Sequence, residues 1–208
     1  QVFDILSTLS QVSYLRPKYL TANRKKNTTE FELTLDNVEK LITKKRDKQF
    51  EELGSKISFF TSLNDDESVG ISISIGVSKA KFQNTIVLDL NFDYKEQSVE
   101  KFDELSEVFK KLVSVFAPFY GCITSRSNSS MFDTYYDKIN NSPTSIFDIN
   151  YWGEDIVNDL PISEIRKKVF ECIEINSGYY IRLQKEPINI SNINHMKLQK
   201  DINCLLGF

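Results

Sequence analysis

The sequence predicts the α+β fold class: one domain with a mainly antiparallel sheet of five to seven strands, backed by helices. Three observations predict it. Apolar residues recur at helical spacing near the start of the chain, residues 56–93 show the two-residue apolar period of strands, and residues 98–116 form a long amphipathic segment. We expect a helical N-terminal part at 1–54 and a sheet-containing core at 56–208, both within a single domain that spans residues 1–208.

The N-terminal part is predicted to hold two helices. The first carries its apolar residues at helical spacing from Val2 to Val12, and Pro17 ends it. The polar stretch TANRKKNTTEFELT, residues 21–34, is interpreted as a loop. Asp36 and Glu39 then form a capping-box pattern, which predicts a second helix that ends near Gly54.

Three strands are predicted next, at residues 56–63, 69–77 and 85–93. The stretch VGISISIGVS places valine and isoleucine on one face and serine on the other, which makes it the clearest strand pattern in the chain. The connections between these strands are short. They therefore predict an antiparallel meander.

The remainder of the chain continues the mixture of helices and strands. The amphipathic helix at 98–116 is ended by Pro118. The later expectations are a strand at 118–125, a loop at 127–130, a short helix or turn at 131–139, a strand at 145–152, a short helix at 153–160, a hairpin of 169–175 with 179–184 joined across Asn176–Gly178, and a closing helix at 195–206.

Composition restricts the class of protein. The net charge is -3, and the basic stretches RPKYLTANRKK and KKRDK are interpreted as solvated loop and helix surface, so we expect no nucleic-acid partner. Three widely spaced cysteines without a CxxC pair disfavour a disulfide framework and a zinc site, and they indicate a reducing compartment. No apolar run approaches the roughly 18 residues of a membrane span, so no membrane partner is expected.

One stretch partly matches a calcium-binding loop. In DLNFDYKEQSVE, the residues Asp89, Asn91, Asp93 and Glu100 occupy ligand positions of that motif. Tyr94 stands where the motif requires glycine, and the preceding residues have strand period. We interpret the acids as the outer face of a strand and expect neither metal nor cofactor. A metal-dependent hydrolase that uses carboxylates around Asp89 and Asp93 is the alternative.

Catalytic constellations are otherwise missing from the sequence. His195 is the sole histidine and would have to serve any Ser-His or Cys-His site, yet no acid or cysteine flanks it in NINHMKLQ. A surface or cap-proximal position is the better interpretation. Neither GxxxxGK[ST] nor GxGxxG occurs. The prediction is a protein that is not an enzyme, with a non-catalytic adaptor as a further alternative.

Residues 126–160 form an acidic, aromatic-rich segment. This segment contains six carboxylates and six large aromatic residues, but its basic residues are only Arg126 and Lys138. Aromatic side chains supply contact area at low entropic cost and carboxylates steer a basic partner, so the segment is typical of a protein-binding surface. The candidate partner-binding residues are Asp133, Tyr135, Tyr136, Asp137, Tyr151, Trp152, Glu154 and Asp155.

The orientation of these side chains can be predicted around DINYWGEDIV, residues 148–157. Phe147 and Ile149 are expected to pack inward, and Trp152 is a candidate for the core as well as for the surface. Tyr151 and the pair Glu154 and Asp155, which follows a turn at Gly153, are expected to face outward.

The same region resembles a known family. INYWGEDIVNDLP, GYYIRLQKEP and LQKDINCLLGF resemble immunity proteins of bacterial polymorphic toxin systems, in which an extended segment ending aromatic-glycine leads into a short helix, a late strand and a closing helix. The resemblance covers residues 145–208. It implies a cytoplasmic antidote, not an enzyme, that neutralises a cognate secreted toxin, often a nuclease, by stoichiometric binding. The oligomeric state stays open.

Overall fold

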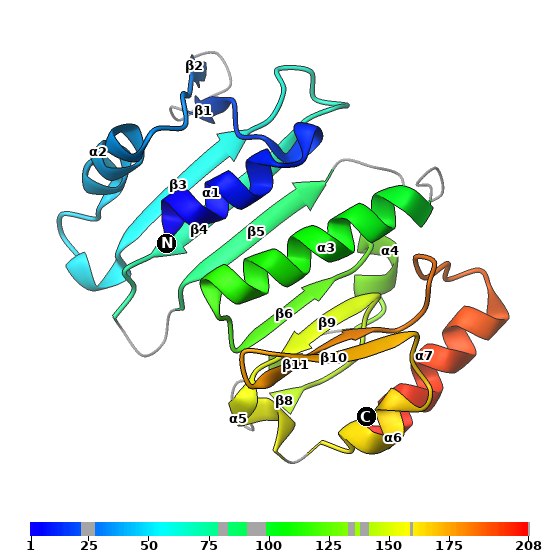
Figure 1. Ribbon diagram of the computed structural model, residues 1–208. Helices are drawn as coiled ribbons and strands as arrows, with labels where there is room; N and C mark the ends of the chain where they lie inside the picture. Colours follow the sequence, from blue (N-terminus) through cyan, green and yellow to red (C-terminus); the bar gives the residue numbers. More distant parts are fainter. Residues whose placement is uncertain are drawn as a thin grey trace. The chain divides into compact units, whose positions relative to one another are not determined.

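The computed structural model of the chain describes residues 1–21, 28–78, 83–90, 99–132, 136–137, 142–158 and 160–207. Contacts divide the chain into two compact units, Gln1–Phe92 and Asp93–Phe208, and each contains an antiparallel sheet with helices (Figure 1). The predicted α+β class and antiparallel pairing are confirmed, and the described strands form a five-stranded, a four-stranded and a two-stranded sheet. That both units form a single domain stays a prediction.

The first unit contains a five-stranded sheet of order β2-β1-β3-β4-β5. Its elements are α1 (Val2–Ser10), a 3-10 turn (Ser13–Leu15), β1 (Tyr19–Thr21), β2 (Thr28–Glu30), α2 (Leu35–Lys45), a second 3-10 turn (Glu51–Leu53), β3 (Ser55–Phe60), β4 (Val69–Ile75) and β5 (Thr85–Leu90). The predicted meander of β3, β4 and β5 is confirmed. Ile57 lies opposite Ile73 in the register, and both side chains are fully buried, as the two-residue period requires.

The loop prediction for residues 21–34 is wrong at Thr21 and at 28–30, which belong to β1 and β2. β1 and β2 pair with each other and add a hairpin to the edge of β3, where Tyr19 lies opposite Phe60 and Leu20 opposite Phe59. The N-terminal part is therefore not purely helical. Tyrosine and threonine favour extended backbone, and pairing with an existing strand edge outweighed the polar composition of this stretch.

Helix α2 begins and ends earlier than predicted. Its N-cap is Thr34, whose Oγ1 accepts a hydrogen bond from the Asn37 N–H at 3.2 Å, so the capping-box assignment to Asp36 is wrong. The helix ends at Lys45, well before Gly54. Arg46 takes extended backbone and pairs with Ser55, which ends the helix.

The second unit contains a four-stranded sheet of order β10-β11-β9-β6. Its elements are α3 (Val99–Phe116), β6 (Tyr120–Ile123), α4 (Arg126–Ser129), β7 (Tyr136–Asp137), β8 (Ser142–Pro143), β9 (Ile149–Trp152), α5 (Glu154–Val157), α6 (Ile162–Arg166), β10 (Glu171–Ile175), β11 (Gly178–Arg182) and α7 (Ile193–Leu205). The long helix, the hairpin and the closing helix are confirmed. The expected loop at 127–130 is mostly helix α4, and Tyr136–Asp137 pairs with β8 instead of forming a helix or turn.

The hairpin of β10 and β11 has a turn that matches its sequence. Asn176 and Ser177 both have positive φ, 51° and 62°, the pattern of a two-residue turn whose twist fits a hairpin. The Asn176 side chain donates a hydrogen bond to the Val113 carbonyl at 3.1 Å. The turn is thereby attached to the C-terminal end of α3.

Helix α3 is held on the sheet by polar contacts as well as by its apolar face (Figure 1). Three such contacts are Asp103–Arg182 at 2.7 Å, Ser106–Tyr180 at 2.6 Å and Lys110–Glu171 at 2.9 Å. The buried Arg182 guanidinium also lies over the rings of Phe102 and Phe170. None of the helices in the described ranges is long and apolar enough to cross a membrane.

Replacing Ser106 by alanine should lower the free energy of unfolding of the second unit by about 2 kcal/mol. The Tyr180 hydroxyl, fully buried, would lose its 2.6 Å partner. Urea unfolding followed by the fluorescence of Trp152, the chain's one tryptophan, measures the loss. The double variant Ser106→Ala with Tyr180→Phe removes both polar groups. Its loss in free energy of unfolding should be smaller than the sum of the losses in the two single variants. Strict additivity of the two single changes would contradict the prediction.

Candidate functional site

Strand β9 is the centre of the candidate partner-binding segment. It pairs with β11 on one side and with β6 on the other. All four of its residues, Ile149–Trp152, are buried. A strand covered on both faces loses the inward and outward alternation of a half-exposed strand, so the side chains of this segment do not divide by two-residue period.

The prediction that Tyr151 faces outward is therefore wrong. Its side chain is 1% exposed, and its hydroxyl donates a hydrogen bond to the Ile175 carbonyl at 3.0 Å. Burial raises the pKa of Tyr151, so the hydroxyl keeps its proton as a donor. Tyr151 joins the central strand to the hairpin and cannot contact a partner while the fold is intact.

Trp152 is fully buried, which settles its position in favour of the core. It packs with Ile156, Ile165 and Ile181 in one apolar cluster. In the folded state its side chain is therefore not accessible to a partner, contrary to its place among the candidate contact residues. Phe147 and Ile149 are also buried, as predicted. The aromatic residues of DINYWGEDIV thus anchor the segment from within.

Glu154 and Asp155 are exposed, as predicted, and begin helix α5. Gly153 makes the sharp change of direction before them. Its N–H donates to the Phe119 carbonyl at 2.8 Å, and a Cβ there would lie only 3.0 Å from that oxygen. Buried Trp152 and Ile156 lie on either side of the pair. We call Glu154 and Asp155 the acidic corner; its role in binding stays a prediction.

The other four candidates cannot be located as fully. Asp133 and Tyr135 lie outside the described residues. For Tyr136 and Asp137 the structure describes the backbone, which forms β7 and lies opposite Pro143 and Ser142. Among the candidate partner-binding residues whose side chains the structure describes, those exposed to solvent are therefore Glu154 and Asp155, the acidic corner.

Asp148 is an acid that sequence reasoning placed in the acidic segment but that lies inside the protein. It is 1% exposed, and its carboxylate accepts a hydrogen bond from the Ile188 N–H. Burial raises the pKa of Asp148 to about 7, against the opposing effect of that hydrogen bond. The available sequence signal was its position between two apolar residues, Phe147 and Ile149.

Further buried polar atoms lie in the same unit. Ser145 Oγ, Asn128 Oδ1 and Gln199 Oε1 have no hydrogen-bond partner among the residues that the structure describes. Atoms of this kind are commonly satisfied by internal water molecules. Gln199 also donates from Nε2 to the Ile146 carbonyl at 2.7 Å, and this bond attaches α7 to the segment before β9.

The structure describes only some of the residues considered for catalysis. Asp89 lies on the exposed face of β5, as interpreted from its strand period, whereas Asn91 and Asp93 fall outside the described residues. His195 lies near the start of α7, where its Nδ1 accepts the Asn189 N–H at 3.1 Å, so the cap-proximal interpretation is confirmed. Within the described ranges, no three His, Cys, Asp or Glu side chains gather closely enough to hold a metal ion.

The cysteines are free thiols. Burial raises the pKa of Cys122 to about 11, and burial also raises the pKa of Cys172. A thiol becomes a good nucleophile as the thiolate. At neutral pH these two side chains are therefore poor nucleophiles.

Comparison of the sequence with known proteins found no relative. No protein-family model matches the sequence, and no curated protein is similar to it at a significant level. The interpretation of the acidic corner depends on the geometry of the chain itself and on the resemblance of residues 145–208.

Proposed function

We propose that the chain is an immunity protein that binds a cognate bacterial toxin stoichiometrically in the cytoplasm and so neutralises it. The observation that carries the proposal is the order of elements after residue 145. β9 ends at Trp152 and Gly153 follows it; then come the short helices α5 and α6, the β10–β11 hairpin and helix α7. An extended segment ending aromatic-glycine, a short helix, a late strand and a closing helix follow one another in the same order in the resembled family.

The acidic corner supports the proposal as a contact surface. Two adjacent carboxylates are presented at a position that the buried Trp152 and Ile156 hold in place, and a rigid support of this kind reduces the entropy lost on binding. Acidic groups attract a basic partner over a distance, and nuclease toxins are expected to be basic because they bind a polyanion.

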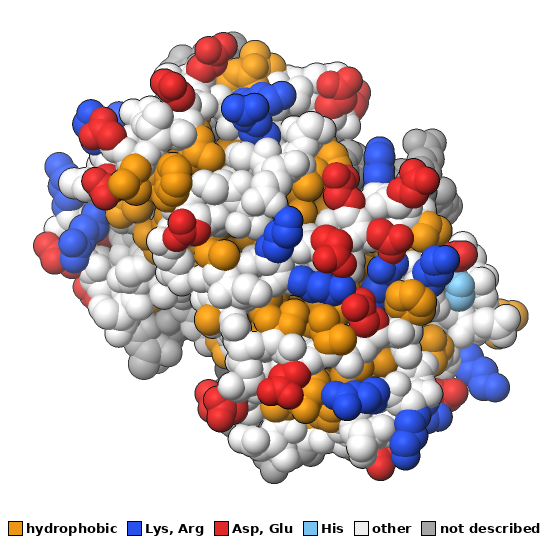
Figure 2. Space-filling view, in the orientation of Figure 1, with side chains coloured by type: hydrophobic (Ala, Val, Ile, Leu, Met, Phe, Trp, Pro, Cys, Tyr) orange, Lys and Arg blue, Asp and Glu red, His pale blue; other side chains and the backbone are white. Residues whose placement is uncertain are grey.

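The face of the second unit in view carries charged side chains of both signs. Figure 2 shows Lys, Arg, Asp and Glu side chains interspersed over that face. Exposed charges are largely screened from one another beyond about 8 Å at physiological salt. Steering of a basic toxin should therefore depend on local groups such as the acidic corner.

Reversing both charges, Glu154→Lys with Asp155→Lys, should weaken binding to the toxin encoded beside this gene by about tenfold or more. The reason is loss of attraction and gain of repulsion at the corner. Surface-immobilised toxin and titrated antidote measure the affinity and the association rate. The rate for the unaltered protein should fall as salt rises.

The matched control reverses another adjacent acidic pair. Asp66 and Glu67 are exposed in the β3–β4 connection of the first unit, so Asp66→Lys with Glu67→Lys makes the same change in net charge. Its affinity for the toxin should stay within about twofold of the unaltered protein at physiological salt. Equal weakening by both pairs would contradict the role of the corner. Failure to form any complex with both proteins at micromolar concentration would overturn the proposed function.

A further inference from the structure

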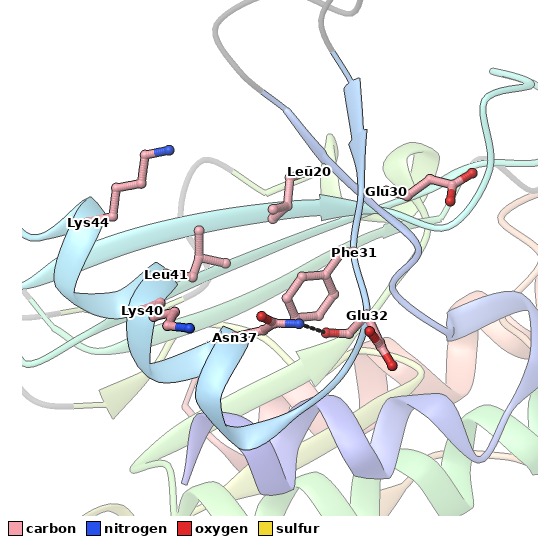
Figure 3. Close-up of a pocket in the computed structure, with 8 residues that line it drawn as sticks. All are labelled: Leu20, Glu30, Phe31, Glu32, Asn37, Lys40, Leu41 and Lys44. Atoms are coloured by element: carbon pink, nitrogen blue, oxygen red, sulfur yellow. Dashed lines mark hydrogen bonds between the residues drawn. The ribbon is translucent and has the colours of Figure 1, made fainter.

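A pocket of about 220 Å³ lies in the first unit, between helix α2 and the β1–β2 hairpin (Figure 3). Its apolar lining comes from three places in the sequence: Leu20 from β1, Phe31 directly after β2, and Leu41 from α2. In Figure 3 these three side chains gather between the helix and the hairpin. They form an apolar floor that a ligand could cover.

The walls of the pocket are held by contacts within the first unit. The Phe31 ring packs against Phe59, with 4.9 Å between the ring centroids. The Asn37 side chain donates to the Glu32 carbonyl at 3.0 Å, a bond that joins the first turn of α2 to the end of the hairpin (Figure 3). A site formed in advance loses less conformational entropy when a ligand binds.

The rim on the α2 side is cationic. Lys40 and Lys44 are four residues apart in the helix and therefore lie on one face. Lys40 pairs with Asp36, whereas Lys44 forms no ion pair with any residue that the structure describes. Glu30, at the end of β2, and Glu32, just after it, also line the pocket. Figure 3 shows Lys44 extending from α2 on the side of Leu20, whereas the Glu30 and Glu32 side chains extend away from α2.

We propose that this pocket binds a small carboxylate with an apolar body, of the size of an arylacetic acid. The apolar body covers Leu20, Phe31 and Leu41 and removes their surface from water, and the carboxylate meets the Lys44 ammonium. Such a ligand fits the chemistry of the pocket because its two ends match the floor and the rim. The proposal goes beyond toxin binding and involves residues of the first unit alone.

The test uses phenylacetate as the probe and the full chain, observed by amide chemical shifts. We expect saturable shifts at Leu20, Phe31 and Leu41 with a Kd of about 1 mM, as is typical of so small a ligand. Phenylacetamide has the same body without charge and should bind more weakly. Benzylamine carries the opposite charge and should not bind. Shifts that do not saturate, or benzylamine binding as well as phenylacetate, would overturn the proposal.

A matched pair of variants tests the rim. Lys44→Gln should weaken phenylacetate binding about two- to fivefold, the range expected for an exposed ion pair. Lys45→Gln removes a neighbouring exposed charge that is not part of the pocket, and it should leave the Kd unchanged. An equal effect of both variants would overturn the assignment of the carboxylate to Lys44. The Glu154 and Asp155 variants should bind phenylacetate normally, so this test fails or succeeds independently of toxin binding.

Discussion

Lowering the pH from about 8 to about 5 should stabilise the second unit by about 3 kcal/mol. The reason is that burying the Asp148 carboxyl group costs less free energy when the group is protonated. The ordinary pKa of this group is 3.8, and burial raises it to about 7 in the folded protein. Below about pH 4 both the folded and the unfolded chain hold the proton. Between about pH 4 and about 7 the unfolded chain releases it first, so stability falls as pH rises; above about 7 the loss is complete.

Other groups with raised pKa values leave this window undisturbed. Burial raises the pKa of Cys122 to about 11 and that of Tyr180 to about 12. Their ordinary values of 9.0 and 10.0 place the corresponding stability changes above the range of the measurement. Urea unfolding at a series of pH values, followed by Trp152 fluorescence, therefore reports mainly on Asp148 among the buried groups.

The variant Asp148→Asn is the control for this prediction. It retains a carbonyl oxygen that can accept the Ile188 N–H and has no group that titrates. We expect a gain of up to about 4 kcal/mol over the unaltered protein at about pH 8 and a much flatter pH profile. A variant profile as steep as that of the unaltered protein would contradict the assignment to Asp148.

Replacing Gly178 by alanine should destabilise the second unit by about 3 kcal/mol or more. A Cβ at this position would lie 2.4 Å from the Trp152 carbonyl oxygen, 2.6 Å from the Tyr151 hydroxyl and 2.8 Å from the Gly153 Cα. Two of these atoms belong to backbone, so relief requires β9 and β11 to move apart. The two strands are paired along Ile149–Trp152, and their separation would disturb the centre of the sheet.

Gly70→Ala in β4 is the matched control. The nearest atom to a Cβ there is the Asp89 Cβ at 3.7 Å, an ordinary contact distance, and we expect a change within about 0.5 kcal/mol. Urea unfolding of both variants, followed by circular dichroism, compares them directly. Equal unfolding midpoints for Gly178→Ala and the unaltered protein would show that the strands can separate without loss and would contradict the prediction.

The elements that sequence predicted best are those formed by local patterns. β4 was found because Val69, Ile71 and Ile73 alternate with polar residues, and α3 because its apolar residues repeat at helical spacing. The β1–β2 hairpin was missed because its stability comes from pairing with β3, in which Phe60 and Phe59 lie about forty residues after their partners Tyr19 and Leu20. Non-local pairing leaves no signal in a short window of sequence.

The candidate site divides in the same way. The exposure of Glu154 and Asp155 could be predicted, because charged residues after a glycine turn rarely lie in the core. The burial of Tyr151 could not, because it depends on tertiary contacts with distant residues, such as the hydrogen bond from its hydroxyl to the Ile175 carbonyl. The pocket floor was also missed, since Leu20, Phe31 and Leu41 meet only through the tertiary fold. Its one sequence signal was a pair of lysines at i and i+4 beside Leu41.

The strand order has a consequence for synthesis on the ribosome. In the first unit β3 pairs with β4 and β4 with β5, the next strand made in each case, and the sheet is complete when Leu90 has emerged. In the second unit β9 must wait for β11, which ends at Arg182. Until then the large aromatic side chains of Tyr151 and Trp152 lack their cover on that side. The first unit can therefore fold while the second is still being made, and the second is the part of the nascent chain most exposed to aggregation.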